Sequence, residues 1–253
     1  MKKLFYVLAL VAVASFAFTG CKKGEPEGNK VVKRLTHLLA YYSQTGTEPN
    51  AEQGVDDFTI SYNADGKIAK IERPDRSWTF SYEGNVITAA YVKEGSAKNP
   101  YVFTLGSNGY VASFVDYENK SYTCEYDAEG HLTKTTKNGE KKSELQWENG
   151  NLKKFSRYES SKWEWKEQTF LAEDNIGGVF PDCDDKAGID RWMFEIGLFG
   201  KPSKKLVDQA AWETSELSAV QTYKKDADGY VTLVDKLYNG KHEFFGYTWE
   251  VVK

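Results

Sequence analysis

Apolar and polar side chains alternate along much of this chain. In the stretch FTISY, which begins at Phe58, the first, third and fifth residues are apolar or aromatic and the others are small and polar. WTFSY from Trp78 and YVFTL from Tyr101 follow nearly the same order. A period of two residues is typical of a half-buried β-strand, because successive side chains of a strand point to opposite faces. These stretches are therefore predicted to be strands with one aromatic face and one polar face.

The alternating runs belong to a repeated unit of about 21 residues. Each unit contains a large, usually aromatic residue, a short turn with glycine, and a second alternating run. The aligned large residues are Tyr62, Tyr82, Leu105, Tyr126, Trp147 and Tyr223, and the turn glycines are Gly66, Gly84, Gly109, Gly130, Gly150 and Gly229. Asp, Asn or Glu precedes each glycine, which suits the positive φ of tight turns. Each unit is predicted to be a β-hairpin.

These hairpins predict an all-β fold. A single hairpin cannot bury its aromatic face, so the units are expected to align into one antiparallel meander over residues 31–253. We expect roughly 12–14 strands, too many for a flat open sheet, so the meander should close or curl strongly into a barrel. Closure also removes exposed strand edges. Strand order should follow the chain.

The repeat is interrupted at about residues 172–219. Apolar residues recur there at helical spacing, and Gly200 and Pro202 provide a stop signal. The apolar positions are Ile189, Trp192, Met193, Ile196 and Phe199. We predict a short helix over Ile189–Phe199 that fills the core, by plugging the barrel or covering one mouth. The alternative is a movable lid over a ligand.

The aromatic face of the barrel is expected to point inward. Many strand runs span only five to seven residues, whereas a strand that crosses a bilayer needs about 9–11. Lys and Glu occur at intervals on both faces, and the mean hydropathy is −0.60. These features favour a barrel that stands in water over one that spans a membrane.

The N-terminus has the features of an export signal. Lys2 and Lys3 precede an apolar stretch of about 15 residues, which is too short for a spanning helix. The following FTGC resembles the lipobox of bacterial lipoproteins, in which the cysteine, here Cys21, carries the lipids. We predict a lipoprotein signal peptide at residues 1–20, lipidation of Cys21, and a flexible tether at residues 21–30, rich in charged residues, glycine and proline. An ordinary signal peptide is the alternative.

The hairpin motif Y-x-x-x-G-x-ψ-x-x-ψ, the lipobox and the stretch GLFGKPSKKL from Gly197 together carry a family resemblance. Over most of residues 31–253 the chain resembles a family of lipoproteins from Gram-negative gut anaerobes, a domain of unknown function with a porin-like barrel. The resemblance implies a barrel and an outer-membrane setting, on either the periplasmic or the cell-surface side, and no activity. The hairpin motif is also similar to the YD-type repeats of secreted shell-forming proteins.

The sequence predicts no catalytic residue, cofactor or metal site. G-x-S-x-G, a Walker loop and H-E-x-x-H are absent, and the three histidines lack metal-ligand spacing. Asp182, Asp184 and Asp185 are weak candidates for calcium, but they lack the EF-hand spacing, and a solvated loop is the alternative.

Tryptophans are the weak candidates for ligand binding. Trp163 and Trp165 could stack on sugars or peptides, although their alternation also fits core residues, and Trp192 would join them in a lid. The formal net charge changes from −4 to −6 when Lys2 and Lys3 are removed, and the absence of a basic stripe argues against nucleic acid as a partner. Cys124 and Cys183 could pair in an oxidising compartment, or Cys124 could be a buried thiol.

Together these features predict a membrane-anchored lipoprotein that is a non-catalytic binding or envelope-scaffold module. Its partners would be the membrane, through the N-terminal lipid, and a possible glycan, peptide or lipid ligand. Two alternatives stay open. One is a carrier of an apolar ligand in the barrel lumen, and the other is a hydrolase of glycans or peptides, which would need convergent carboxylates or a histidine. The sequence indicates no oligomeric state.

Overall fold

The structure is a computed structural model that describes residues 31–43, 56–159, 161–180, 189–213 and 218–252. The predicted signal peptide, Cys21 and the tether lie outside these residues. The described part contains the strands β1 (Lys33–Ser43), β2 (Asp56–Tyr62), β3 (Ile68–Arg73), β4 (Arg76–Glu83), β5 (Val86–Lys93), β6 (Ser96–Ala97), β7 (Tyr101–Leu105), β8 (Val111–Val115), β9 (Ser121–Tyr126), β10 (Leu132–Lys137), β11 (Glu140–Glu148), β12 (Asn151–Glu159), β13 (Lys162–Asp174), β14 (Lys205–Trp212), β15 (Ser218–Lys225), β16 (Val231–Tyr238) and β17 (Lys241–Val251), and the helix α1 (Arg191–Glu195).

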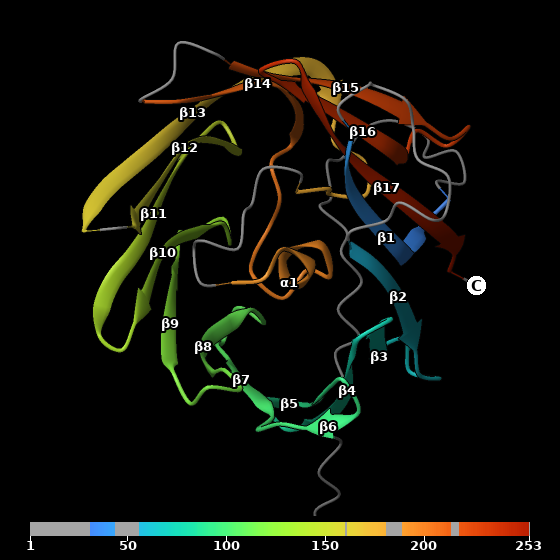
Figure 1. The fold of residues 1–253 in the computed structure, drawn as a ribbon, viewed down its shortest axis with the longest axis vertical. Helices are drawn as coiled ribbons and strands as arrows, with labels where there is room; N and C mark the ends of the chain where they lie inside the picture. Colours follow the sequence, from blue (N-terminus) through green and yellow to red (C-terminus); the bar gives the residue numbers. More distant parts are fainter. Residues whose placement is uncertain (1–30, 44–55, 160, 181–188, 214–217, 253) are drawn as a thin grey trace, which may run out of the picture. The chain divides into compact units, whose positions relative to one another are not determined.

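The strands close into an antiparallel barrel (Figure 1). In the described residues, all seventeen strands belong to one sheet, and β6 pairs only with β5. The other sixteen pair in chain order, and the ring closes where β1 pairs with both β17 and β2. The all-β barrel and its strand order are therefore confirmed. The ring has more strands than the expected 12–14, and one of the additional strands is β14, which lies inside the stretch that we had assigned to the insert.

The connection between β13 and β14 is shorter than the predicted insert, since strands reach Asp174 and resume at Lys205. Its helix α1 has five residues, Arg191–Glu195, whereas we predicted Ile189–Phe199. The chain leaves the helical conformation after Ile196 because Gly197 and Gly200 adopt positive φ values of 78° and 94°. Within the described residues, no helix is long and apolar enough to cross a bilayer.

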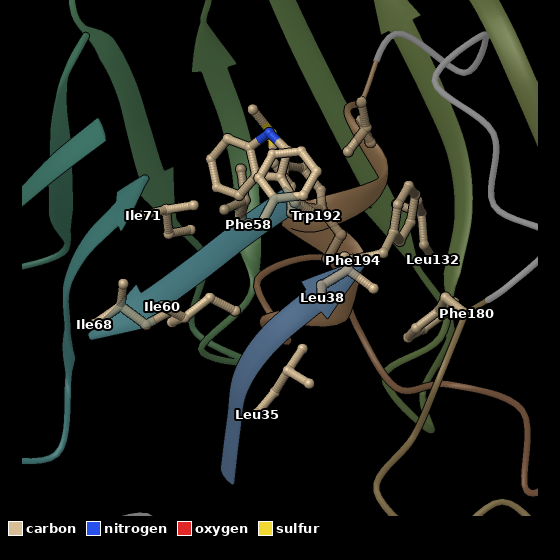
Figure 2. Close-up of a cluster of buried hydrophobic side chains, with 14 of the residues drawn as sticks. Leu35, Leu38, Phe58, Ile60, Ile68, Ile71, Leu132, Phe180, Trp192 and Phe194 are labelled. Atoms are coloured by element: carbon tan, nitrogen blue, oxygen red, sulfur yellow. The ribbon is translucent and has the colours of Figure 1, made fainter. Parts of the chain in front are cut away.

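The aromatic faces of the strands point inward, onto α1 and the turn that follows it. The Trp192 ring lies 4.8 Å from Trp78 and 6.2 Å from Phe80, both in β4. Phe199 lies 5.6 Å from Phe114 of β8. Figure 2 shows Trp192 among the buried side chains of this core. The helix α1 therefore packs as the predicted plug, and its Trp192 side chain is only 2% exposed.

The segment after α1 is joined by backbone hydrogen bonds to turns at one end of the barrel. Lys201 N donates to Gly130 O (2.9 Å), and Lys204 N donates to Gly150 O (3.0 Å). In an antiparallel meander alternate turns lie at the same end, so the turn glycines of the repeat and the β13–β14 connection share that end. A Cβ at Gly200 would lie 2.8 Å from Gly130 O, so this approach requires glycine.

The repeated aromatic residue supplies a hydrogen-bond donor to the neighbouring strand. At five repeat positions, and again at Trp249, a hydroxyl or indole N–H donates to a carbonyl of the preceding strand in the ring, at 2.6–2.9 Å. The pairs are Tyr62 with Leu35, Tyr82 with Ile68, Tyr126 with Val111, Trp147 with Leu132, Tyr223 with Val207, and Trp249 with Val231. Burial raises the pKa of Tyr62 and of Tyr82 to about 12, so these hydroxyls keep the proton that they donate.

Each accepting carbonyl belongs to a residue beside a β-bulge. The register shifts beside Leu35, Ile68, Val111, Leu132, Val207 and Val231. A bulge disrupts the ladder locally, so a carbonyl there needs another donor. The register of β4 and β5 is continuous, and the aligned residue on the next strand is Leu105, which has no side-chain donor. Bulge and donor therefore occur together.

Replacing Tyr126 with Phe should lower the free energy of unfolding by about 1–2 kcal/mol, because the Val111 carbonyl loses its donor. Tyr110→Phe is the matched control, since the Tyr110 ring stacks on Tyr126 with centroids 5.5 Å apart and no bond from the Tyr110 hydroxyl is recorded among the described residues. Denaturant unfolding of both variants measures the difference. Equal losses would contradict the proposed role of the hydroxyl.

Replacing Trp192 with Ala should cost about 3–5 kcal/mol, because it empties a large buried aromatic site in the centre of the core. Trp163→Ala removes the same side chain from a position that is 36% exposed, and it should cost less than about 1 kcal/mol. Denaturant unfolding compares the two variants. A cost below about 1 kcal/mol for Trp192→Ala would show that α1 is not a fixed plug.

Candidate functional site

A cavity of about 180 Å³ lies against the wall formed by β13 to β17, and it is partly open to solvent. The rings of β4, β7 and β8 pack on α1 and Phe199, and α1 also contacts this wall through Arg191 and β17. The described residues that line the cavity are Lys166, Ala210, Trp212, Ala219, Lys236, Tyr238, Lys241, His242 and Glu243. Tyr238 and Lys241 flank the β16–β17 turn, so the cavity lies near the barrel end opposite the β13–β14 connection.

The strand register places charged lining side chains on the inner face of the wall. Tyr247 and Phe245 of β17 face inward, since Arg191 of α1 donates to Tyr247 OH (2.9 Å) and Arg191 Cζ lies 3.5 Å from the Phe245 ring centroid. Glu243 is two residues before Phe245 and so faces the same way. Its cross-strand partner is Lys236 of β16, and directly paired residues share a face.

The cavity exists in part because two alanine side chains are too small to fill the space beside them. Ala210 of β14 pairs directly with Ala219 of β15, and both are buried. Val220, the next residue along β15, is 39% exposed, as expected for a side chain on the outer face. Other inner positions of the barrel hold rings such as Trp78, so two adjacent methyl groups leave a void in the packing.

A buried lysine and a tryptophan form one side of the cavity. Lys166 of β13 pairs with Trp212 of β14, and Lys166 is only 3% exposed. Lys166 Nζ lies 5.3 Å from the Trp212 ring centroid, and Arg157 Cζ lies 4.2 Å from it. Cations over an indole ring are attracted by its negative face, and the attraction is larger away from water. The cluster is therefore a cationic, aromatic surface.

Carboxylates pair with cations of this wall. Glu243 Oε2 lies 3.1 Å from Lys236 Nζ, and Glu164 Oε2 lies 3.1 Å from Arg157 Nη2. Hydrogen bonds from Lys162 and Arg157 hold the pKa of Glu164 below its usual value, so Glu164 is ionised at neutral pH. Glu243 and Glu164 are therefore ion-pair partners of cations. Such an arrangement is suited to binding and orienting a ligand.

A buried charged cluster joins α1 to the barrel wall. Glu195 Oε1 accepts hydrogen bonds from Phe180 N (3.1 Å) and Tyr247 OH (3.0 Å), and lies 3.4 Å from Arg191 Nη2. Burial raises the pKa of the Glu195 carboxyl, and the Arg191 guanidinium opposes that shift. The Glu195 side chain is 2% exposed, so a substrate cannot reach it. The cluster holds α1 in place and satisfies polar groups that would otherwise be costly to bury.

The sequence candidates do not converge on the cavity. Trp163 and Trp165 alternate with Lys166 and Gln168, which are buried, so both tryptophans lie on the outer face, and the core interpretation is wrong for them. Trp163 packs beside Tyr158, and Lys154 Nζ lies 3.9 Å above the Trp165 ring.

The other candidates are buried or lie outside the described residues. Trp192 is in the core. Cys124 is a buried free thiol whose pKa is raised to about 12 by burial. Cys21, Cys183, Asp182, Asp184 and Asp185 lie outside the described residues. In the part of the chain that is described, no group of three or more His, Cys, Asp or Glu residues could hold a metal.

Sequence reasoning missed the cavity residues. Lys166 and Gln168 alternate with tryptophans in KWEWKEQ, and the alternation alone does not say which set faces inward. Only the pairing of β13 with β14 establishes that the Trp163 side chain faces outward. Ala210 and Ala219 carried no signal, since small residues leave a void only where they meet across two strands.

Solved structures with the same architecture are known. The crystal structure of a porin-like protein from Bacteroides uniformis superposes with a TM-score of 0.64 at 18% identity, over 85% of this chain and 98% of that one. A porin-like protein from Bacteroides vulgatus gives a TM-score of 0.56 at 14% identity, over 87% and 100% of the two chains. At this identity the likeness shows the fold alone. No family model matches the chain, and no curated protein matches it.

Proposed function

We propose that this protein is a lipid-anchored, non-catalytic binding module of the cell envelope, which holds a small ligand in the cavity against β13–β17. The observation that carries the proposal is the cavity itself, which combines an unfilled volume with polar side chains from several strands. The rings of α1 and Phe199 pack on β4 and β8, and α1 touches this wall at Tyr247 and Phe245 of β17, which do not line the cavity.

The position of the charges favours a barrel that stands in water at the end of a tether. Positions on the outer face carry Ser, Thr and ion pairs such as Lys134–Glu125 (2.8 Å), and the inner face carries the aromatic core. A barrel inserted in lipid has the opposite order, with an apolar band outside. A lipidated Cys21 would then supply the attachment to the membrane that the strands do not.

The lining of the cavity argues against the two alternatives. A carrier of an apolar ligand would be lined predominantly by apolar side chains, whereas this lining includes Lys166, Lys236, Lys241 and Glu243. Glycoside hydrolysis commonly uses two carboxylates that flank the bond. Among the described lining residues Glu243 is the acid, and it is paired with Lys236.

A variant that fills the cavity tests the binding role. Wild-type protein should be stabilised against thermal unfolding by a compound from a panel of glycans, peptides, lipids and small acids, by about 2.7 kcal/mol at a concentration of 100 Kd. Ala219→Phe should abolish that shift, because the ring occupies the ligand's space. Val220→Phe places the same ring on the outer face and should keep the shift. A shift that survives Ala219→Phe would exclude this cavity as the site.

Replacing Cys21 with Ser should move the protein from the membrane fraction to the soluble fraction, because lipidation requires the thiol. Fractionation after a high-salt wash measures the distribution, and Cys124→Ser is the control, since that thiol is buried in β9. A Cys21→Ser protein that still sediments with membranes would contradict the lipid anchor. Protease treatment of intact cells tells which side of the outer membrane the barrel occupies.

A further inference from the structure

Exposed apolar surface is concentrated at the seam where β1 meets β17. Val32, Val251 and Val252 are 60%, 51% and 46% exposed, and no other large apolar side chain that the structure describes exceeds 40%. The three valines are neighbours, since Val252 N donates to Val32 O (2.9 Å) and Val251 pairs with Lys33. Apolar surface gathered in one exposed place is favourable to bury and indicates a contact surface. We call these three residues the valine tip.

The valine tip lies at the end of the barrel from which the predicted tether leaves. Alternate turns of a meander share one end, so β1 starts and β17 ends at the end that carries the β13–β14 connection. The tether, residues 21–30, joins Cys21 to this end. The cavity lies near the opposite end. The valine tip is therefore at the end of the barrel to which the predicted lipid is attached.

The length of the tether decides which end of the barrel faces the membrane. A flexible chain as long as residues 21–30 spans about 17 Å on average. Strand β1 has 11 residues, so it is about 36 Å long and spans about 28 Å along the barrel axis at the usual tilt of about 40°. Because the average tether is shorter than the barrel, the far end reaches the membrane only when the tether is extended along the wall. The seam end is therefore held near the bilayer surface.

The charged side chains beside the valine tip have partners of opposite charge. Lys33 Nζ lies 2.7 Å from Asp226 Oδ2 and 2.5 Å from Asp228 Oδ2, and Arg34 forms an ion pair with Glu250. A charge that keeps its partner costs less to bring close to lipid than an unpaired charge. Long cationic side chains also leave their charged heads in water while their stems cover apolar surface. These residues therefore permit the valines to approach a bilayer.

We propose that the valine tip contacts the lipid bilayer into which the acyl chains of Cys21 insert. The valines enter the boundary between headgroups and acyl chains, where apolar side chains of interfacial proteins lie. The barrel then stands on its seam end, and the cavity faces away from the membrane and takes its ligand from solution. This inference rests on the lipid anchor of the proposed function, and it adds a contact between the barrel itself and the same membrane.

A fluorophore that reports contact with lipid tests the proposal. The full chain, with Cys124 and Cys183 replaced by serine and Cys21 kept, is labelled at Val252→Cys, purified in detergent and reconstituted into vesicles of phosphatidylcholine that carries a nitroxide on its acyl chain. The nitroxide should quench this probe, because quenching requires near contact. A probe at Glu140→Cys should keep its fluorescence, since Glu140 is exposed beside the β10–β11 turn at the opposite end.

Paired substitutions separate the effect of the valines from that of the tether. Val32→Ser with Val251→Ser should weaken the quenching of the Val252→Cys probe, because the apolar contact is lost while the tether stays. Val220→Ser with Leu237→Ser is the matched control and should leave the quenching unchanged. These two residues pair directly across β15 and β16, and they are 39% and 40% exposed. The comparison of the Val252→Cys and Glu140→Cys probes holds even if a double variant fails to fold.

The outcomes separate this inference from the anchor on which it rests. If the protein floats with the vesicles but the Val252→Cys probe is not quenched, or both probes are quenched equally, the valine contact is wrong and the anchor stands. Quenching that survives Val32→Ser with Val251→Ser would also overturn the contact, because the tether alone would then explain it. A Val252→Cys probe shielded from iodide in water but not quenched by lipid would assign the tip to a protein partner or a second copy. If the protein does not float with the vesicles, the anchor and the contact are both wrong.

Discussion

The hydrogen bond from a repeated aromatic side chain to a bulge carbonyl is the interaction on which this barrel depends. A β-bulge bends and twists a strand, and such bending lets a long meander curl into a closed ring. The bulge also leaves a carbonyl without its usual ladder partner, beside the buried core. Tyr82 and Tyr126 meet this requirement from the next strand, and at the same time they add ring surface to the core. One residue type thus serves curvature, hydrogen bonding and packing.

This interaction also explains which parts of the fold could be predicted from sequence. The alternating runs and the Asp-Gly or Asn-Gly turns are local signals, and they predicted the hairpins, the strand order and the closed all-β architecture. The helix was predicted too long, because apolar spacing at Ile196 and Phe199 continues past Gly197, where the backbone turns away. The strand count was too low, in part because β14 lacks the repeat's turn and was assigned to the insert.

The candidate site could not be predicted for a different reason. Successive side chains of a strand alternate between its two faces. The alternation alone therefore does not say whether Trp163 or Lys166 faces inward. Burial of Lys166 depends on the pairing of β13 with β14. The space beside Ala210 exists only because Ala219 lies directly opposite. The burial of Lys166 and the space beside Ala210 both depend on the strand register, and the register depends on residues far apart in the chain.

Closure of the ring has a consequence for the biogenesis of the protein. The seam joins β1 to β17, with Lys33 opposite Val251, so the first strand completes its pairing only after the last strand has been made. Contacts of such long sequence separation slow folding, and the unpaired edges of a partial meander invite association with other chains. The growing barrel therefore presents an open edge until its last strand has been made.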